Sequence, residues 1–191
     1  MRIIAGTHKN RALATPKGLQ TRPTASKLRQ ALFNICQGYI QEALFLDLFA
    51  GSGAMGLEAL SRGAQKAVFV DSNKEAVKCI YTNLKEFNME ERAEVVSGDV
   101  FRAIDQLIKK GYQFDIIYAD PPYEKRDMHD ALTYGEKVIR KIDEQNLLKS
   151  GGSLFVEDAG NAIEDIQGLK SLSLSSERKL GRSVLLHYEE L

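Results

Sequence analysis

Two kinds of apolar spacing alternate along most of this chain. Continuous apolar runs of about four to eight residues indicate buried strands, and apolar residues at every third or fourth position indicate helices. Beyond Glu42 the two patterns follow one another regularly. The predicted strands are Ala43–Leu48, Lys66–Val70, Ala93–Val96, Phe114–Ala119 and Ser153–Glu157. The predicted helices are Met55–Arg62, Lys74–Phe87, Phe101–Lys110 and Met128–Leu147, the last stopped by Gly151-Gly152.

This alternation predicts an α/β fold with a doubly wound, mostly parallel sheet of the Rossmann-like kind, covered by helices on both faces. The C-terminal region has a different pattern. Leu169–Ser175 and Arg182–Tyr188 are β-rich runs joined by Ser176–Gly181, without a helix between them. They are predicted to form an antiparallel hairpin at one edge of the sheet.

The first 41 residues form a separate N-terminal extension in this interpretation. Short strands at Arg2–Ala5 and Arg11–Thr15 predict a hairpin, and Thr24–Tyr39 has helical spacing. Residues 42–191 are then the ligand-binding and catalytic domain. A chain of 191 residues is long enough for one buried core and too short for two large ones.

Charge distinguishes the extension from the rest of the chain. The whole chain has 26 basic and 26 acidic residues, but residues 1–41 contain seven basic and no acidic ones. A cationic surface of this kind favours a polyanionic partner such as a nucleic acid, the alternative being a solvated basic segment without a partner. The predicted RNA-binding residues are Arg2, Lys9, Arg11, Arg22, Lys27 and Arg29.

Other features narrow the class of protein. The chain has no uninterrupted apolar run of about 18 residues, so we expect no membrane span, and its first residues lack the long apolar segment of a secretory signal. Cys36 and Cys79 have no metal-ligand spacing and are expected to be reduced packing residues of a cytoplasmic protein. No metal site is predicted, and we expect a monomer.

The turn after the first predicted strand has a glycine-rich sequence, Gly51-Ser52-Gly53-Ala54-Met55-Gly56. Such a turn lets backbone amides approach a ligand, and it suits both a dinucleotide and S-adenosylmethionine. Asp47 lies four residues before Gly51. A carboxylate there would repel a pyrophosphate but could hold the cationic amino-acid end of S-adenosylmethionine.

Two more carboxylates follow the next two strands. Asp71 could bind ribose hydroxyls and Asp99 the exocyclic amine of adenine, although each could instead cap the helix that follows it. Their shared position at successive strand ends favours a common ligand. The predicted cofactor-binding residues are Asp47, Phe49, Ala50, Gly51, Gly53, Asp71, Ser72, Asp99 and Val100.

The fourth strand leads into Asp120-Pro121-Pro122-Tyr123, a sequence that stops both strand and helix. An exocyclic aromatic amine is a poor nucleophile because its lone pair is delocalised into the ring. The Asp120 carboxylate and the Pro121 carbonyl could accept its N–H groups, Pro122 would stiffen the loop, and Tyr123 could stack on the base. These four residues are the predicted catalytic loop for methyl transfer from a sulfonium to an amine.

The two motifs, Asp47 through Gly53 and Asp120 through Tyr123, resemble those of class I S-adenosylmethionine-dependent amino-methyltransferases. With three N-terminal segments, Met1–Gly6, Thr21–Thr24 and Arg29–Ile35, the chain most specifically resembles the 16S rRNA (guanine(966)-N(2))-methyltransferase family. The resemblance implies S-adenosyl-L-methionine as cofactor, S-adenosyl-L-homocysteine as product and 16S ribosomal RNA or the small-subunit particle as partner. Where we expected a glutamate to hold the ribose, this chain has Asp71.

Three alternatives stay open at this point. The enzyme could methylate the N6 of adenine, or another exocyclic amine, in DNA or RNA. The chain could be a non-catalytic RNA-binding factor of ribosome assembly, although such a protein has no evident use for the Asp120 loop. A dinucleotide-dependent oxidoreductase is disfavoured by Asp47.

Overall fold

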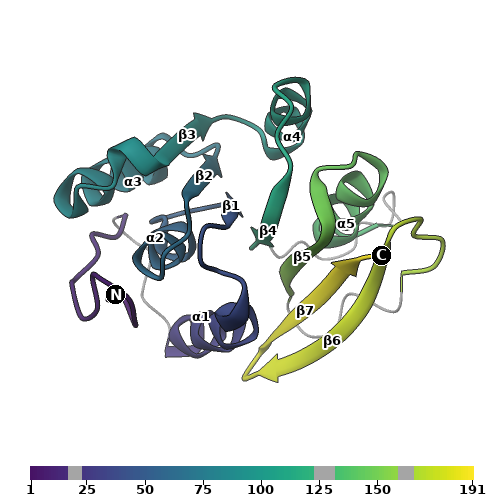
Figure 1. Cartoon of the computed structure of the whole chain (residues 1–191), viewed down its shortest axis with the longest axis horizontal. Coiled ribbons are helices and arrows are strands. Elements are labelled where there is room, and N and C mark those ends of the chain that lie inside the picture. The colour runs from purple at the N-terminus through teal and green to yellow at the C-terminus, as the bar shows by residue number, and fades with distance from the viewer. Residues whose placement is uncertain (17–22, 123–131, 159–165) are drawn as a thin grey trace.

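The structure, a computed structural model, describes residues 1–16, 23–122, 132–158 and 166–191. Within them, one sheet has the strand order β3-β2-β1-β4-β5-β7-β6 (Figure 1). The strands are β1 (Leu44–Leu48), β2 (Lys66–Asp71), β3 (Ala93–Ser97), β4 (Phe114–Ala119), β5 (Leu148–Asp158), β6 (Leu172–Leu180) and β7 (Ser183–Glu190). The helices are α1 (Pro23–Ile35), α2 (Ala54–Ser61), α3 (Lys74–Phe87), α4 (Val100–Lys109) and α5 (Tyr134–Glu144), with 3-10 turns η1 (Cys36–Gly38) and η2 (Glu90–Arg92).

The sheet confirms the predicted doubly wound architecture. Strands β1 to β5 pair in parallel, whereas β7 pairs antiparallel with both β5 and β6. The chain reverses the direction of strand addition between β1 and β4, which are neighbours. Open α/β sheets bind ligands at the carboxyl ends of the strands beside such a switch point.

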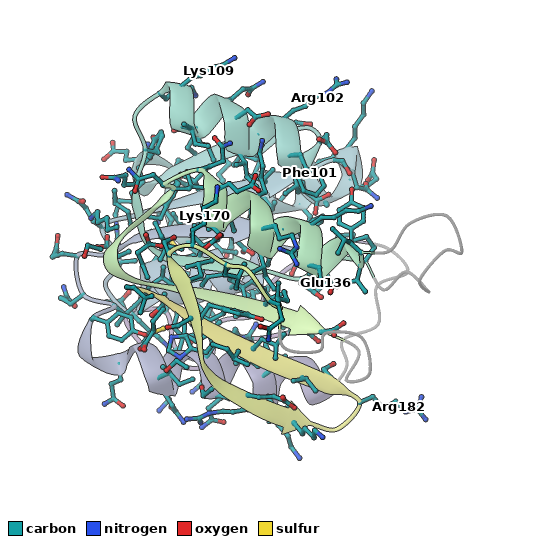
Figure 2. The ribbon with its side chains drawn as sticks, turned by 90° about the vertical axis from the view of Figure 1, so that its right-hand side faces the viewer. Phe101, Arg102, Lys109, Glu136, Lys170 and Arg182 are labelled. Atoms are coloured by element: carbon teal, nitrogen blue, oxygen red, sulfur yellow. The ribbon has the colours of Figure 1, made fainter. Side chains whose placement is uncertain are left out.

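Helices cover the two faces as separate layers (Figure 1). Alternate residues of a strand face opposite sides, so Phe45 packs in the core beneath α1, α2 and α3, and Leu46 in the core beneath α4 and α5. Figure 2 shows α5 between α4 and the β6-β7 hairpin, with Arg102 and Lys109 on the outer side of α4 and Arg182 at the hairpin tip. None of the helices in the described ranges is long and apolar enough to cross a membrane.

The N-terminal extension packs into the first of these cores. Ile3, Leu13 and Leu28 are buried in the same cluster as Phe45. The two strands predicted around residues 2–15 are reduced to a single antiparallel bridge, between Arg2 and Ala12. The extension is therefore continuous with the core of residues 42–191.

The helix predicted over Met128–Leu147 is shorter in the structure, because α5 begins at Tyr134. A capping box fixes this start: the Glu136 N–H donates to Thr133 Oγ1 (3.1 Å) and the Thr133 N–H donates to Glu136 Oε2 (2.7 Å). Residues 128–131 of the predicted helix lie outside the described ranges.

The prediction that Gly151-Gly152 stops this helix is wrong. Helix α5 ends at Glu144, and both glycines lie within β5. Gly151 has φ +73°, and the register of β5 against β4 shifts between Phe114 and Ile116. The glycines therefore belong to a strand irregularity. The hairpin is confirmed, but β6 continues to Leu180, so most of the predicted linker is strand.

Candidate active site

The turn from β1 into α2 has an unusual backbone. Phe49, Gly51 and Gly53 have φ values of +61°, +57° and +76°. A side chain at Gly56 would enter the ring of Phe69, so this glycine lets α2 pack closely on β2. At Gly51 an added Cβ would meet no described atom within 4 Å. Gly51 therefore borders open space, where a ligand can approach the backbone.

Asp47 lies beneath this turn and is 1% exposed. Its Oδ2 accepts a hydrogen bond from the Gly56 N–H at 2.9 Å, near the start of α2. Burial raises the pKa of the Asp47 carboxyl well above its ordinary value, and the charges of Asp120 and Asp71 raise it further. A buried carboxyl surrounded by other acids is a site that favours a cationic ligand group.

Asp71, at the end of β2, joins two strand ends. Its Oδ2 accepts from the Gly51 N–H (2.7 Å) and its Oδ1 from the Asn73 N–H (2.8 Å). The alternative that Asp71 caps α3 is wrong, because Asn73 is the N-cap, with its side chain accepting from the Glu75 and Ala76 N–H groups. A carboxylate has about four acceptor positions, so Asp71 can also accept from ribose hydroxyls.

Asp99 follows β3 and caps α4, accepting from the Arg102 N–H at 3.1 Å. The capping role that we considered is confirmed, and it leaves acceptor capacity for an adenine amine. Ser72 is exposed beside Asp71, whereas Val100 is buried in the α4 core. Phe49 and Ala50 are half-buried, and the Phe49 ring lies edge-on to Tyr134 with 5.7 Å between centroids.

Asp120 lies beside the predicted cofactor edge, which is the set of strand ends that carry Asp47, Asp71 and Asp99. Its N–H donates to the Leu48 carbonyl at 3.3 Å, which places the start of the predicted catalytic loop next to the end of β1. Pro121 is buried and Pro122 is exposed, while Tyr123 lies outside the described residues. The structure therefore brings Asp47, Asp71 and Asp120 to one edge of the sheet, because β1 pairs with β2 and β4 and its end is bonded to both Asp71 and Asp120.

Sequence reasoning missed Glu157, at the end of β5. The Tyr118 hydroxyl donates to Glu157 Oε2 at 2.9 Å. Tyr118 is 4% exposed, and its pKa is raised well above the ordinary value by burial and by the charges of Asp120 and Glu157. The available signal was positional, since Glu157 lies near the end of the fifth strand, as the predicted acids lie at or near the ends of the others.

The predicted RNA-binding residues have different environments. Arg2, Lys9 and Lys27 are exposed. Arg11 is half-buried, pairs with Glu86 at 3.1 Å, and stacks over Phe87. Arg22 lies outside the described residues.

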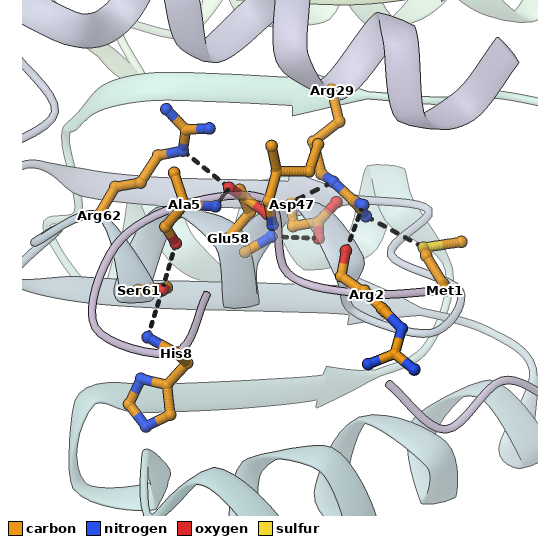
Figure 3. Close-up of polar contacts among 11 residues, drawn as sticks. Met1, Arg2, Ala5, His8, Arg29, Asp47, Glu58, Ser61 and Arg62 are labelled. Carbon is orange, nitrogen blue, oxygen red and sulfur yellow. Dashed lines mark hydrogen bonds and ion pairs between the residues drawn. The ribbon is translucent and has the colours of Figure 1, made fainter. Parts of the chain in front are cut away.

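Arg29, a predicted RNA-binding residue, does not lie at the surface, because its side chain is 2% exposed. Figure 3 shows its guanidinium group turned toward Met1 and Arg2. Its Nη2 donates to the Arg2 carbonyl at 2.7 Å and its Nη1 to Met1 Sδ at 3.0 Å. Its Nε lies 3.5 Å from Glu58 Oε2. Burial lowers the pKa of Arg29, and Glu58 opposes that shift. Arg29 is a buried structural cation and cannot reach RNA phosphates from this position.

Glu58 of α2, the partner of Arg29, anchors the N-terminal extension. Its two oxygens accept from the N–H groups of Ile4 (2.8 Å) and Ala5 (3.0 Å), and Oε1 also pairs with Arg62 Nε (2.8 Å). One residue of α2 therefore fixes the extension and α1 together, because it binds backbone from the first and Arg29 from the second.

Asn83 of α3 connects the extension to the cofactor turn. Its Nδ2 donates to the carbonyls of Ala14 and Ser52, each at 3.0 Å, and its Oδ1 accepts from the Ala14 N–H at 2.8 Å. The side chain is 1% exposed. A single buried amide therefore ties the extension to the glycine-rich turn.

A family model described as conserved hypothetical protein 95 matches residues 1–189. Among curated proteins, YlbH of Bacillus subtilis strain 168, which has the provisional name rRNA methyltransferase, is 37% identical over 82% of each chain. Ribosomal RNA small subunit methyltransferase D of Haemophilus influenzae is 33% identical, over 82% of this chain and 78% of its own.

Solved structures give the same result. The yhhF protein of Escherichia coli, provisionally described as a methyltransferase, superposes with a TM-score of 0.82 at 31% identity, covering 100% of this chain and 97% of its own. A Thermus thermophilus 16S rRNA N2 G1207 methyltransferase in complex with AdoMet and guanosine has a TM-score of 0.69 at 20% identity, covering 92% and 45%, which is a likeness of fold. The chain belongs to the conserved hypothetical protein 95 family and has the fold of class I S-adenosylmethionine-dependent methyltransferases.

Proposed function

We propose that this protein transfers a methyl group from S-adenosylmethionine to the exocyclic N2 amine of a guanine in small-subunit ribosomal RNA. The observation that carries the proposal is the position of Asp120, whose backbone bond to Leu48 sets an amine-accepting loop directly beside the glycine-rich turn. The small-subunit relatives support ribosomal RNA as the substrate. S-adenosyl-L-homocysteine would be the other product, and the reaction would take place in the cytoplasm, where the substrate is.

The residues at the cofactor edge fit S-adenosylmethionine. Asp47 would hold the cationic amino-acid end, Asp71 the ribose hydroxyls and Asp99 the adenine amine, while Gly51 leaves the backbone accessible. When bound, the cofactor supplies a methyl group on a positively charged sulfur. The buried, acid-rich surroundings of Asp47 favour a ligand of that charge over a pyrophosphate.

Asp120 and the Pro121 carbonyl would accept the two N–H groups of the guanine amine. These contacts draw the amine nitrogen away from conjugation with the ring and hold it near attack distance. The amine needs no strong base before attack, because its proton becomes acidic only as the new N–C bond forms. Asp120 or water then accepts that proton.

Arg2, Lys9 and Lys27, with Arg22 beyond the described residues, would bind phosphates around a guanine that has left its stack. We propose residues 1–41 as the RNA-docking extension and residues 42–191 as the catalytic domain, acting as a monomer on the small-subunit particle. In a filter-binding assay, Lys9→Glu with Lys27→Glu should reduce the salt slope of RNA affinity by about 2. Lys109→Glu with Lys170→Glu, on exposed positions outside the extension, is the matched control.

The activity test uses labelled S-adenosylmethionine with naked small-subunit RNA, small-subunit particles and duplex DNA. Mass spectrometry of the digested product should show N2-methylguanosine from RNA or particles. N6-methyladenosine, or label in DNA alone, would overturn the proposal. Calorimetry should detect binding of S-adenosylmethionine and none of NAD, and NAD binding alone would remove the cofactor assignment.

A further inference from the structure

Glu157 is the neighbour of Asp120 across two parallel strands. The register pairs Tyr118 with Phe155 and Ala119 with Val156, so Asp120 and Glu157 are the next residues on the two chains. The side chain of Glu157 lies on the same face of the sheet as Tyr118, because the two are hydrogen-bonded. The register therefore sets Asp120 and Glu157 side by side, and the charges of both raise the pKa of the Tyr118 hydroxyl beyond the effect of its burial.

Tyr118 and Glu157 lie on the face of the sheet that the N-terminal extension covers. Tyr118 and Phe155 belong to the core cluster that contains Ile3 and Leu28. Asp47 pairs with Tyr118 and is influenced by Asp120, so the cofactor edge adjoins the same place. A base delivered by RNA on the extension would reach this corner of the sheet.

The Tyr118 hydroxyl holds the Glu157 side chain in place. A buried tyrosine whose pKa is raised remains a neutral hydroxyl, and it donates its proton to the carboxylate at 2.9 Å. A carboxylate has acceptor oxygens only. With Asp120 beside it, the corner has two adjacent carboxylates that match two adjacent donors on a ligand.

The Watson–Crick edge of guanine has such a pair, N1–H and the N2 amine, whereas adenine has a lone pair at N1 beside its N6 amine. We propose that Glu157 accepts the N1–H of the target guanine while Asp120 accepts from the amine, and that Glu157 thereby makes the site select guanine over adenine. Adenine would place its N1 lone pair against a carboxylate, and a site built to accept a hydrogen bond rejects a base that cannot donate one. The inference rests on the proposed function, since it assigns the residue that reads its substrate.

The test uses small-subunit RNA in which the methylated nucleotide is guanine, 2-aminopurine or adenine, each assembled into particles by ligation and reconstitution. 2-Aminopurine keeps the N2 amine but has no N1–H. The wild-type enzyme should methylate guanine roughly 10- to 100-fold faster than 2-aminopurine in single turnover, as expected for a hydrogen bond to a charged group. It should leave adenine unmethylated.

Glu157→Gln should slow methylation of guanine and narrow the ratio of guanine to 2-aminopurine to within about 3-fold, because the carboxamide can donate to an N1 lone pair. Asp158→Asn, the adjacent acid on the opposite side of β5, should keep the wild-type ratio. Calorimetry with S-adenosylmethionine checks that each variant is folded and binds cofactor.

Equal slowing of guanine and 2-aminopurine by Glu157→Gln would overturn the inference and leave Glu157 as a structural partner of Tyr118. If that variant does not fold, the wild-type rates on guanine and 2-aminopurine still test the inference. A guanine preference below about 3-fold would exclude an N1–H contact of this strength. Failure of the proposed function is separate: the wild-type enzyme would then form no N2-methylguanosine on the guanine particle.

Discussion

The two halves of the candidate site use carboxylates in different ways. At the cofactor edge, Asp47, Asp71 and Asp99 each accept from the backbone N–H of a neighbouring turn or helix. At the acceptor edge, which consists of Asp120 and Glu157, Glu157 accepts from the side-chain hydroxyl of Tyr118 instead. The predicted cofactor carboxylates therefore shape the backbone turns around the site, whereas Glu157 positions the side chain of a tyrosine.

The largest effect should follow from Asp120→Ala. Loss of the acceptor for the amine should reduce the single-turnover rate by about 100- to 1,000-fold, the usual loss when a group aimed at developing charge is removed. Affinity for S-adenosylmethionine should change less than about 3-fold in calorimetry, because the backbone N–H to Leu48 is kept. A rate within about 5-fold of wild type would show that the loop is only a turn.

Glu58→Ala should destabilise the packing of the N-terminal extension, which covers the face of the sheet that carries Tyr118 and Glu157. It leaves the buried guanidinium of Arg29 without its carboxylate, and the N–H groups of Ile4 and Ala5 without acceptors. Removing one partner of a buried ion pair costs about 3–5 kcal/mol, measured here as the free energy of unfolding in urea. Adding Arg29→Met should restore part of that loss. If Glu58→Ala alone costs less than about 1 kcal/mol, the cluster does not anchor the extension.

Asp71→Asn should weaken S-adenosylmethionine binding by about 10- to 100-fold. An amide cannot accept on both sides, so its NH2 group would face one of the N–H groups of Gly51 and Asn73. At saturating cofactor the rate should stay within about 3-fold of wild type. A fall in the saturated rate with unchanged affinity would contradict the separation of the two edges.

Asn83→Asp tests the connection between the extension and the cofactor turn. The carboxylate can still accept from the Ala14 N–H, but it cannot donate to the carbonyls of Ser52 and Ala14. We expect a loss of about 1–3 kcal/mol in the free energy of unfolding and a 3- to 10-fold weaker cofactor affinity. Thr82→Val, on the same helix and exposed, is the control. Unchanged cofactor affinity would show that the turn does not depend on the extension.

Asp47→Asn should have the smallest effect on structure, and its effect on the free energy of unfolding depends on pH. Because the folded-state pKa of Asp47 is raised, the folded protein binds the proton more tightly than the unfolded chain. The wild-type protein therefore loses stability as pH rises from about 4 through that raised pKa. Asn keeps the acceptor for Gly56 and carries no charge, so in urea unfolding the variant should be more stable than wild type at pH 8 and similar near pH 4. It should also bind S-adenosylmethionine less tightly.

Much of the fold could be predicted because spacing and strand-end chemistry are local. The limits of α3, from Lys74 to Phe87, could be predicted from periodicity, although the residue that caps it is Asn73 and not Asp71. Gly151-Gly152 misled the prediction because glycine ends helices and also permits irregular strands, and only the neighbouring strand decides between them.

The site could be predicted where one chain segment carries the chemistry, as at Asp47 to Gly53 and at Asp120. Arg29 was misplaced because its partner, Glu58, is distant in sequence, and pairing with it turned an expected surface cation into a buried one. Glu157 was missed for a related reason, since only the pairing of β4 with β5 places it beside Asp120.

The two buried cysteines can report how often two regions of this molecule open. Cys36 is 0% exposed and burial raises its pKa to about 12, while Cys79, 9% exposed with a raised pKa, donates from Sγ to the Ala14 carbonyl. Thiol reagents attack the thiolate, so labelling proceeds only when these regions open. Cys79 then reports excursions of the N-terminal extension and Cys36 unfolding of the core beneath α1. The ratio of the two labelling rates measures how often the N-terminal extension detaches while the core beneath α1 stays intact.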